Sequence, residues 1–170
     1  MFDLFSDPVK VANQMQIIYS EYGFAIWETM YSLALETAFA YLIGLPLGVL
    51  LVTGEKEGVK PLPKPIMTVM NVVINLLRSV PFLILMIICL PLSKVIVGTK
   101  VGTIATIPPM VIAAFPLVAR MVEGSLREVD QGVVEAAQSM GASPWQIVTK
   151  VMLPESLHSI VLGITLALIA

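Results

Sequence analysis

Three apolar stretches of this 170-residue chain are each about as long as a lipid bilayer is thick. They cover residues 24–52, 65–92 and 101–118, and a helix needs roughly 20 apolar residues to cross the hydrocarbon core. Only 13% of the residues are charged, whereas a soluble domain usually carries about 25%. We therefore expect an all-α polytopic membrane protein.

The two ends of the chain differ from these three stretches. Residues 1–23 are mildly amphipathic and predict a short interfacial helix. At the other end, an apolar run covers residues 157–170, fewer than the roughly 20 that a membrane span requires. This predicts a truncated chain that stops inside a fourth membrane helix. The alternative is a short re-entrant or surface helix.

Basic residues are unevenly distributed among the connecting segments. Those of the first and third connections are Lys56, Lys60, Lys64, Arg120, Arg127 and Lys150. Those expected on the opposite side are Lys10, Lys94 and Lys100. Because short cytoplasmic loops carry an excess of lysine and arginine, we expect the first and third connections inside the cell and the N-terminus outside.

The third connection, residues 120–156, is polar and amphipathic, and its pattern indicates two short helices. Asp130 is a favourable N-cap for a first helix over residues 131–140, because its carboxylate can accept hydrogen bonds from free backbone N–H groups. Gly141 supplies the left-handed residue with which many helices end.

A second helix restarts directly after this glycine. Ser143, Pro144 and Gln146 occupy its N-cap, first and third positions, which is a capping-box pattern. We expect the helix to reach Leu153 and to end at Pro154, because proline cannot continue the hydrogen-bond ladder. Its apolar flank consists of Trp145, Ile147, Val148 and Val151. Such a flank indicates a docking surface or, alternatively, a helix pair that lies on lipid headgroups.

This connection resembles the EAA loop of ABC importer permeases. The matching residues are Glu135, Ala136, Ala137, Gly141, Leu153 and Pro154, at the spacing of that motif. Val151 is a mild departure, since the motif prefers isoleucine there. The resemblance implies a coupling helix that sits in a groove of a separate ATP-binding subunit. Ala142, Ser143 and Trp145 follow Gly141 closely, and we count them with the motif as candidate residues for coupling to the ATPase.

Further segments are similar to the permease subunits of D,L-methionine ABC importers. They begin at Trp27, Gly44, Arg78, Val95, Ala119 and Met140. The likeness covers most of the chain after residue 24, and it implies a type I ABC importer permease bundle. Members of that family have a longer chain, so about three to four of five transmembrane helices are expected here.

The resemblance also implies a set of partners. We expect a homodimer with a second copy of the chain, two copies of an ATPase subunit that bind Mg-ATP, and an extracytoplasmic methionine-binding protein. The chain itself is expected to bind no cofactor and to lie in the lipid bilayer of a bacterial inner membrane. A permease for another amino acid or small nutrient stays open, as does a stand-alone channel, a secondary transporter or a non-transporting scaffold.

Four polar residues within the apolar stretches are candidates for the protein interior, because charged groups in membranes usually face protein or water. They are Glu36, Asn71, Asn75 and Arg78. The last three fall on one helical face, and Pro81 predicts a kink beside them. Arg78 would serve either helix packing or a translocation path. We also hypothesise an ion pair between Arg78 and Glu36.

Small residues and prolines predict how the spans pack. Gly44 and Gly48 form a small-xxx-small pattern, which allows two helices to approach closely. Pro108, Pro109 and Pro116 predict an irregular third span, since broken helices are tolerated in membranes where protein or water satisfies the freed carbonyls.

Other functions are excluded by missing sequence patterns. The sequence has no phosphate-cradling glycine-rich loop and no nucleophile motif, so we expect neither an ATPase site nor any catalytic residue. One Cys and one His leave too few ligands for a structural metal site. The net charge of -2 argues against a nucleic-acid partner, because phosphate binding requires clustered basic residues.

Overall fold

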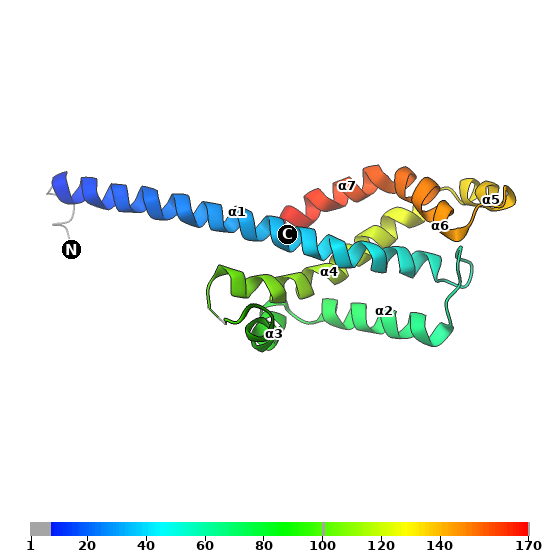
Figure 1. The fold of residues 1–170 in the computed structure, drawn as a ribbon, viewed down its shortest axis with the longest axis horizontal. Helices are drawn as coiled ribbons and strands as arrows, with labels where there is room; N and C mark the ends of the chain where they lie inside the picture. The colour runs from blue at the N-terminus through cyan, green and yellow to red at the C-terminus, as the bar shows by residue number, and fades with distance from the viewer. Residues whose placement is uncertain (1–7, 100, 170) are drawn as a thin grey trace. The chain divides into compact units, whose positions relative to one another are not determined.

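A computed structural model describes the backbone of residues 8–99 and 101–169, and the side chains of residues 16, 19, 21–99 and 101–165 (Figure 1). Every element assigned in these ranges is helical, which confirms the expected fold class. The elements are α1 (Pro8–Thr53), α2 (Lys64–Ser79), α3 (Phe82–Val97), α4 (Thr103–Arg127), α5 (Gln131–Ser139), α6 (Pro144–Ile147), the π-helical η1 (Val148–Met152) and α7 (Leu153–Ile169).

Helix α1 continues without interruption across residue 23. The separate short helix expected over residues 1–23 is therefore wrong from Pro8 onward, and residues 1–7 lie outside the described part. No proline or cap breaks the ladder there, and a single Gly23 costs a helix only about 1 kcal/mol. The chain divides into two compact units, Met1–Ala34 and Leu35–Ala170, and the second unit is the bundle that carries the candidate site.

Helix α4 is the central helix of this bundle. It contacts α2, α3 and α7, and it meets α1 at two glycines. A Cβ placed on Gly44 would lie 2.7 Å from the side chain of Val118. The close helix approach predicted from the small-residue pattern is thus confirmed.

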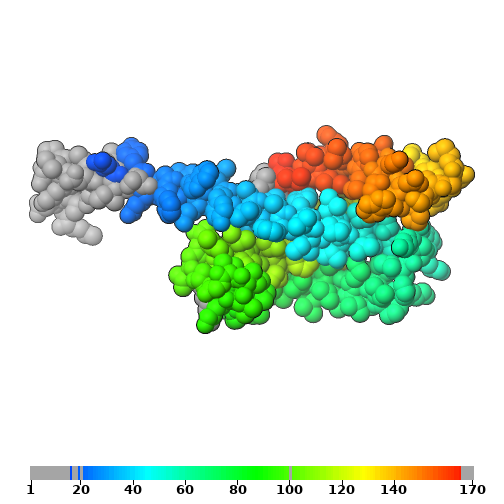
Figure 2. Space-filling model, in the orientation of Figure 1, coloured from blue at the N-terminus to red at the C-terminus, as the bar shows by residue number. Residues whose placement is uncertain are grey.

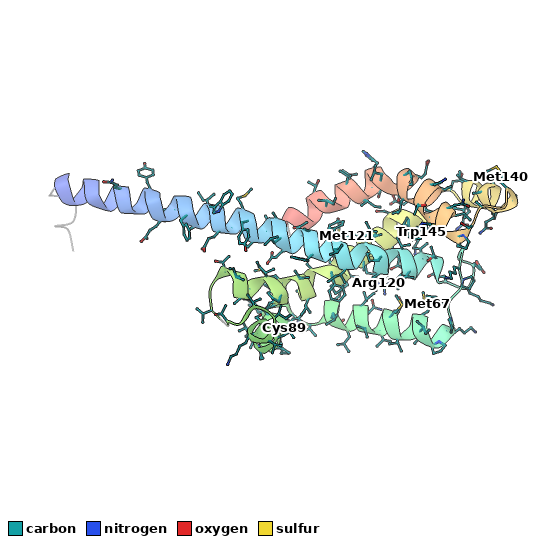
Figure 3. The ribbon with its side chains drawn as sticks, viewed as in Figure 1. Met67, Cys89, Arg120, Met121, Met140 and Trp145 are labelled. Atoms are coloured by element: carbon teal, nitrogen blue, oxygen red, sulfur yellow. The ribbon has the colours of Figure 1, made fainter. Side chains whose placement is uncertain are left out.

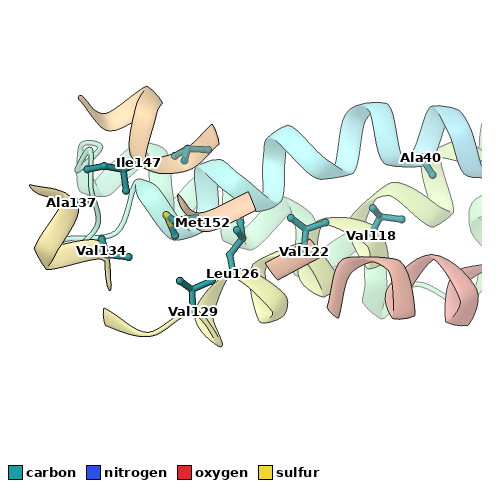
Figure 4. Close-up of a cluster of buried hydrophobic side chains, with 10 residues drawn as sticks. Ala40, Val118, Val122, Leu126, Val129, Val134, Ala137, Ile147 and Met152 are labelled. Atoms are coloured by element: carbon teal, nitrogen blue, oxygen red, sulfur yellow. The ribbon is translucent and has the colours of Figure 1, made fainter. Parts of the chain in front are cut away.

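The main hydrophobic core is continuous from the long helices into the segment after α4 (Figure 4). Its buried members are Ala40, Val118, Val122, Leu126, Val129, Val134, Ala137, Ile147, Val148 and Met152. A second, smaller cluster joins α1, α2 and α4 through Leu51, Ile74 and Ala119. The short helices α5 and α6 therefore share one core with α1 and α4.

The second apolar stretch is two helices with a sharp break at Pro81, where the sequence predicts a kink. Helices α2 and α3 meet at an angle of 110°. Val80 between them is extended, because the ring of a following proline disfavours helical conformation in the residue before it. Pro81 then caps the start of α3. Within the described residues, three helices are long and apolar enough to cross a membrane, or up to four if this bent pair is one span.

The third and fourth stretches are longer than expected. Helix α4 runs through all three of its prolines to Arg127, so the irregular third span is wrong. Pro109 and Pro116 are buried, and their packing offsets the free energy lost with the backbone hydrogen bonds that prolines cannot donate. The expected stop at Pro154 is also wrong, because α6, η1 and α7 follow one another without a gap. Pro144–Thr165 is thereby a candidate span of 22 residues.

Candidate functional site

The first short helix of the candidate site begins where the sequence predicts. The Oδ1 atom of Asp130 accepts a hydrogen bond from the backbone N–H of Gly132 at 2.7 Å. This satisfies one of the free donors in the first turn of α5. The N-cap prediction is confirmed, and the helix covers Gln131–Ser139.

The end of α5 has the hydrogen bonds of a Schellman motif. Gly141 has a φ of 78°, and its N–H donates to the carbonyl of Gln138 at 2.9 Å. The N–H of Ala142 donates to the carbonyl of Ala137 at 3.1 Å. The left-handed glycine predicted at this elbow is confirmed, and it turns the chain into α6.

A capping box starts α6. The backbone N–H of Ser143 donates to Oε1 of Gln146 at 2.9 Å. In return, the backbone N–H of Gln146 donates to Oγ of Ser143 at 3.4 Å. Both hydrogen bonds of the predicted pattern are present, so the angle between α5 and α6 is held by local bonds at both sides of the elbow.

The apolar residues of this helix pair are divided between core and surface. Ile147 and Val148 are buried, so their expected place on an exposed docking flank is wrong. They close the core under the pair, because a short helix buries only the side that faces the bundle. Trp145 and Met140 are 75% and 82% exposed, and Figure 3 marks both on this segment. In the space-filling view, the side chains of α5 and α6 form the surface at one end of the bundle (Figure 2).

The residues of the EAA pattern also separate by exposure. Glu135 and Ala136 are exposed, whereas Ala137 is buried and Leu153 is half-buried. Val151 is half-buried and Pro154 is exposed. The motif therefore combines outward side chains on α5 with residues that fasten the helix pair to its core.

Glu135 faces a hollow of about 330 Å³ between α5, the end of α4 and the loop after α1. Glu55, Glu57 and Arg127 line the same hollow. The exposed part of the motif is therefore bordered by charged side chains from two other segments.

The intramembrane polar residues are arranged differently from our expectation. Asn71 and Asn75 both accept hydrogen bonds from Arg120, at 2.7 and 2.9 Å. Arg78 is exposed, and the structure has no ion pair between it and Glu36. A buried carboxylate oxygen of Glu36 has no hydrogen-bond partner in the described part of the chain. The hypothesised Arg78–Glu36 pair is therefore wrong.

Arg120 and Glu123 were not among the predicted site residues. The sequence placed Arg120 in a loop, because the apolar stretch ends at Val118. Helix α4 continues beyond that point, so Arg120, Glu123 and Arg127 lie at helical spacing on one face. That i, i+3, i+7 spacing of opposite charges is the sequence signal that could have revealed them.

Metal binding finds no support in the described residues, where no group of three His, Cys, Asp or Glu side chains is placed to hold an ion. The only cysteine in the sequence, Cys89 (Figure 3), is half-buried in α3.

Comparison with known proteins gives one consistent result. Residues 44–170 match the family model for the binding-protein-dependent transport system inner membrane component. A probable D-methionine transport system permease protein, MetI, of Vibrio cholerae is 48% identical over 145 residues. That match covers 85% of this chain and 64% of the relative, so the chain spans less than two thirds of its length.

Two further matches point the same way. The D-methionine transport system permease protein MetI of Escherichia coli is 42% identical over 144 residues, with 85% of this chain and 66% of the relative covered. A solved structure of the MetNI methionine ABC transporter in an inward-facing conformation superposes with a TM-score of 0.82 at 40% identity. It covers 85% of this chain and 66% of that chain.

Proposed function

Because the chain belongs to the family of inner membrane components of binding-protein-dependent transport systems, we propose that it is a permease subunit of an ATP-driven ABC importer for D- and L-methionine. It is an all-helical, multi-pass membrane protein of that family. The observation that carries the proposal is the helix pair α5–α6, which displays Glu135 and Trp145 on the outside while sharing a core with α4.

The helix pair suits a role in coupling to an ATPase. Its outer surface carries the exposed side chains of Met140 and Trp145, and methionine and aromatic residues are enriched at protein docking surfaces. Its inner side contributes Val134, Ala137 and Ile147 to a core shared with α4, and both short helices contact η1. A push on the outer surface would therefore move α4 as well, because packed cores transmit displacement. A separate ATP-binding subunit, carrying Mg-ATP, would supply that push.

The remaining partners follow from the same proposal. Two copies of the chain would form the path, two ATP-binding subunits would dock on the two helix pairs, and an extracytoplasmic binding protein would deliver methionine. The segment after α1 and the helix pair would face the cytoplasm and the N-terminus would lie outside, as the distribution of basic residues favours. The chain would bind no cofactor and carry no ATPase site of its own.

The test is uptake of radiolabelled L-methionine by vesicles that contain the protein together with the ATP-binding subunit encoded beside it, with the methionine-binding protein added on the extracytoplasmic side. We expect uptake that requires ATP and that unlabelled D-methionine competes away. Uptake without the ATP-binding subunit would indicate a channel or secondary transporter instead. Absence of methionine uptake, together with ATP-dependent uptake of another labelled amino acid, would support the alternative of another nutrient permease.

A further inference from the structure

A chain of polar contacts links α2 to the loop after α1 by way of α4. The side chain of Arg120 extends from α4 toward α2 (Figure 3). Its guanidinium donates to Oδ1 of Asn71 at 2.7 Å and to Oδ1 of Asn75 at 2.9 Å. Its other terminal nitrogen donates to Glu123 at 2.6 Å.

Glu123 connects this cluster to a second arginine. One carboxylate oxygen accepts from Arg120 and the other from Arg127, the latter at 2.9 Å. Arg127 in turn binds Glu55 in the loop after α1 at 2.5 Å. The Glu123 side chain is only 9% exposed, so a buried carboxylate is held between two guanidinium groups. Removing one partner of such a pair leaves an uncompensated charge, which is costly.

Helix α2 has few apolar contacts with the rest of the bundle. Among the residues of α2, only Ile74 is buried, and Met67 and Met70 are partly buried against the same small cluster. The side chains of Val69, Val72 and Leu76 are exposed. Arg120 adds two hydrogen bonds, from a charged donor, across the same interface. Charge-assisted hydrogen bonds are roughly twice as strong as neutral ones. The position of α2 relative to α4 therefore depends strongly on Arg120.

The two ends of the polar chain lie at parts with different roles. One end is α2, an apolar helix, and the other is Glu55, which lines the same hollow as Glu135 of the EAA motif. Helix α4 leads into α5 through only the residues between Arg127 and Gln131. Movement of the helix pair therefore reaches α4 directly, and it reaches α2 through Arg120 in addition to the small cluster of Leu51, Ile74 and Ala119.

We propose that Arg120, braced by Glu123, is a positioning residue that makes α2 follow α4 when the ATP-binding subunit moves the helix pair. This inference rests on the proposed function. It assigns to the polar chain the step that passes movement of the docking surface, driven by ATP hydrolysis in the partner subunit, to a second membrane helix.

The test compares Arg120→Met and Arg120→Lys with wild type, in proteoliposomes that contain the protein and the ATP-binding subunit encoded beside it, with the methionine-binding protein supplied on the extracytoplasmic side. Three quantities are measured: assembly of the complex, ATP hydrolysis and uptake of radiolabelled L-methionine. For Arg120→Met we expect assembly and hydrolysis within about twofold of wild type and a loss of about tenfold in methionine taken up per ATP, within the usual range of coupling effects. Arg120→Lys should be intermediate. Lys64→Met, which removes an exposed cation from the same helix α2, is the matched control and should behave as wild type.

A second variant keeps the test decisive if Arg120→Met does not assemble. The double variant Asn71→Leu and Asn75→Leu removes the acceptors on α2 and leaves the contacts among Arg120, Glu123 and Arg127 intact. It should uncouple in the same way. Uptake per ATP that stays at the wild-type value in this variant would overturn the positioning role. Wild-type protein that shows no ATP-dependent uptake would instead defeat the proposed function.

Discussion

Gly48 in α1 packs so closely on Ala119 in α4 that a Cβ on Gly48 would lie 2.7 Å from the Ala119 carbonyl oxygen. The obstacle is a backbone atom, which cannot turn aside as the end of a flexible side chain can. Ala119 is fully buried at the junction of α1, α2 and α4. The helix separation in this part of the bundle is therefore set by the absence of a side chain at one position.

Gly48→Ala should lower the stability of the bundle by about 1–3 kcal/mol, because overpacking forces the two helices apart. Gly124→Ala, in α4, is the control, since nothing lies within 4 Å of a Cβ there and alanine favours a helix. Thermal unfolding in detergent measures both. Equal melting temperatures for the two variants would contradict the close contact.

Gly141→Ala should weaken binding of the ATP-binding subunit without a steric clash. Nothing lies within 4 Å of a Cβ at this residue, so the cost comes from its left-handed backbone, about 1–2 kcal/mol for a residue with a Cβ. Gly141→Asn should be milder, because asparagine tolerates this conformation better. Co-purification of the two subunits measures the effect. Equal binding by both variants would show that the left-handed backbone at residue 141 is not the cause of the weaker binding.

Asp130→Ala should destabilise α5 by about 0.5–2 kcal/mol through loss of its N-cap. Asp130→Asn keeps an oxygen that can accept from the N–H of Gly132, and it should retain most of the wild-type stability. Amide hydrogen exchange in α5 measures the difference directly. We expect faster exchange in the alanine variant alone, and faster exchange in both would show that the charge matters more than the hydrogen bond.

Pro154→Ala should change the register between α6 and α7. The N–H of Leu153 donates to the carbonyl of Val148, five residues back, which is the hydrogen bond of a π turn. A π turn before Pro154 avoids the clash of the proline ring with the preceding turn. With alanine, a regular α-helix becomes possible, and it would rotate α7 by about 100° relative to α6.

The rate at which an engineered disulfide forms between α4 and α7 measures this rotation. A Cβ on Gly163 in α7 would lie 3.9 Å from the Cβ of Met121 in α4, within the range of about 3.5–4.5 Å for a disulfide. In a Cys89→Ser background, Met121→Cys with Gly163→Cys should cross-link readily on oxidation. Adding Pro154→Ala should slow the cross-link. An unchanged rate would mean that the proline does not set the register.

The parts of the candidate site that could be predicted from the sequence depend on short-range hydrogen bonds. Asp130 bonds a residue two positions ahead, and Ser143 and Gln146 bond each other. Gly141 needs only its own backbone conformation. Such contacts form wherever the local pattern occurs, so the elbow between α5 and α6 was predicted with its caps.

Exposure within the helix pair was less predictable. Ile147 and Trp145 belong to the same short apolar run, yet one is 1% exposed and the other 75%. Four residues are one turn of helix, too few for periodicity to mark the inner side. The core beneath α6 decides which of the two is buried, because Ile147 belongs to the same buried cluster as Val134 and Met152.

The sequence by itself determined an apolar helical protein, the elbow between two short helices and the close approach of α1 at its glycines, because composition, caps and small-residue spacing act over a few residues. The tertiary structure alone decided that Arg120, and not Arg78, meets Asn71 and Asn75. Those partners are 49 and 45 residues away in the chain. Local pattern indicates the break at Pro81 and the helical spacing of Arg120, Glu123 and Arg127, but it gives neither the 110° angle between α2 and α3 nor a partner 45 residues away.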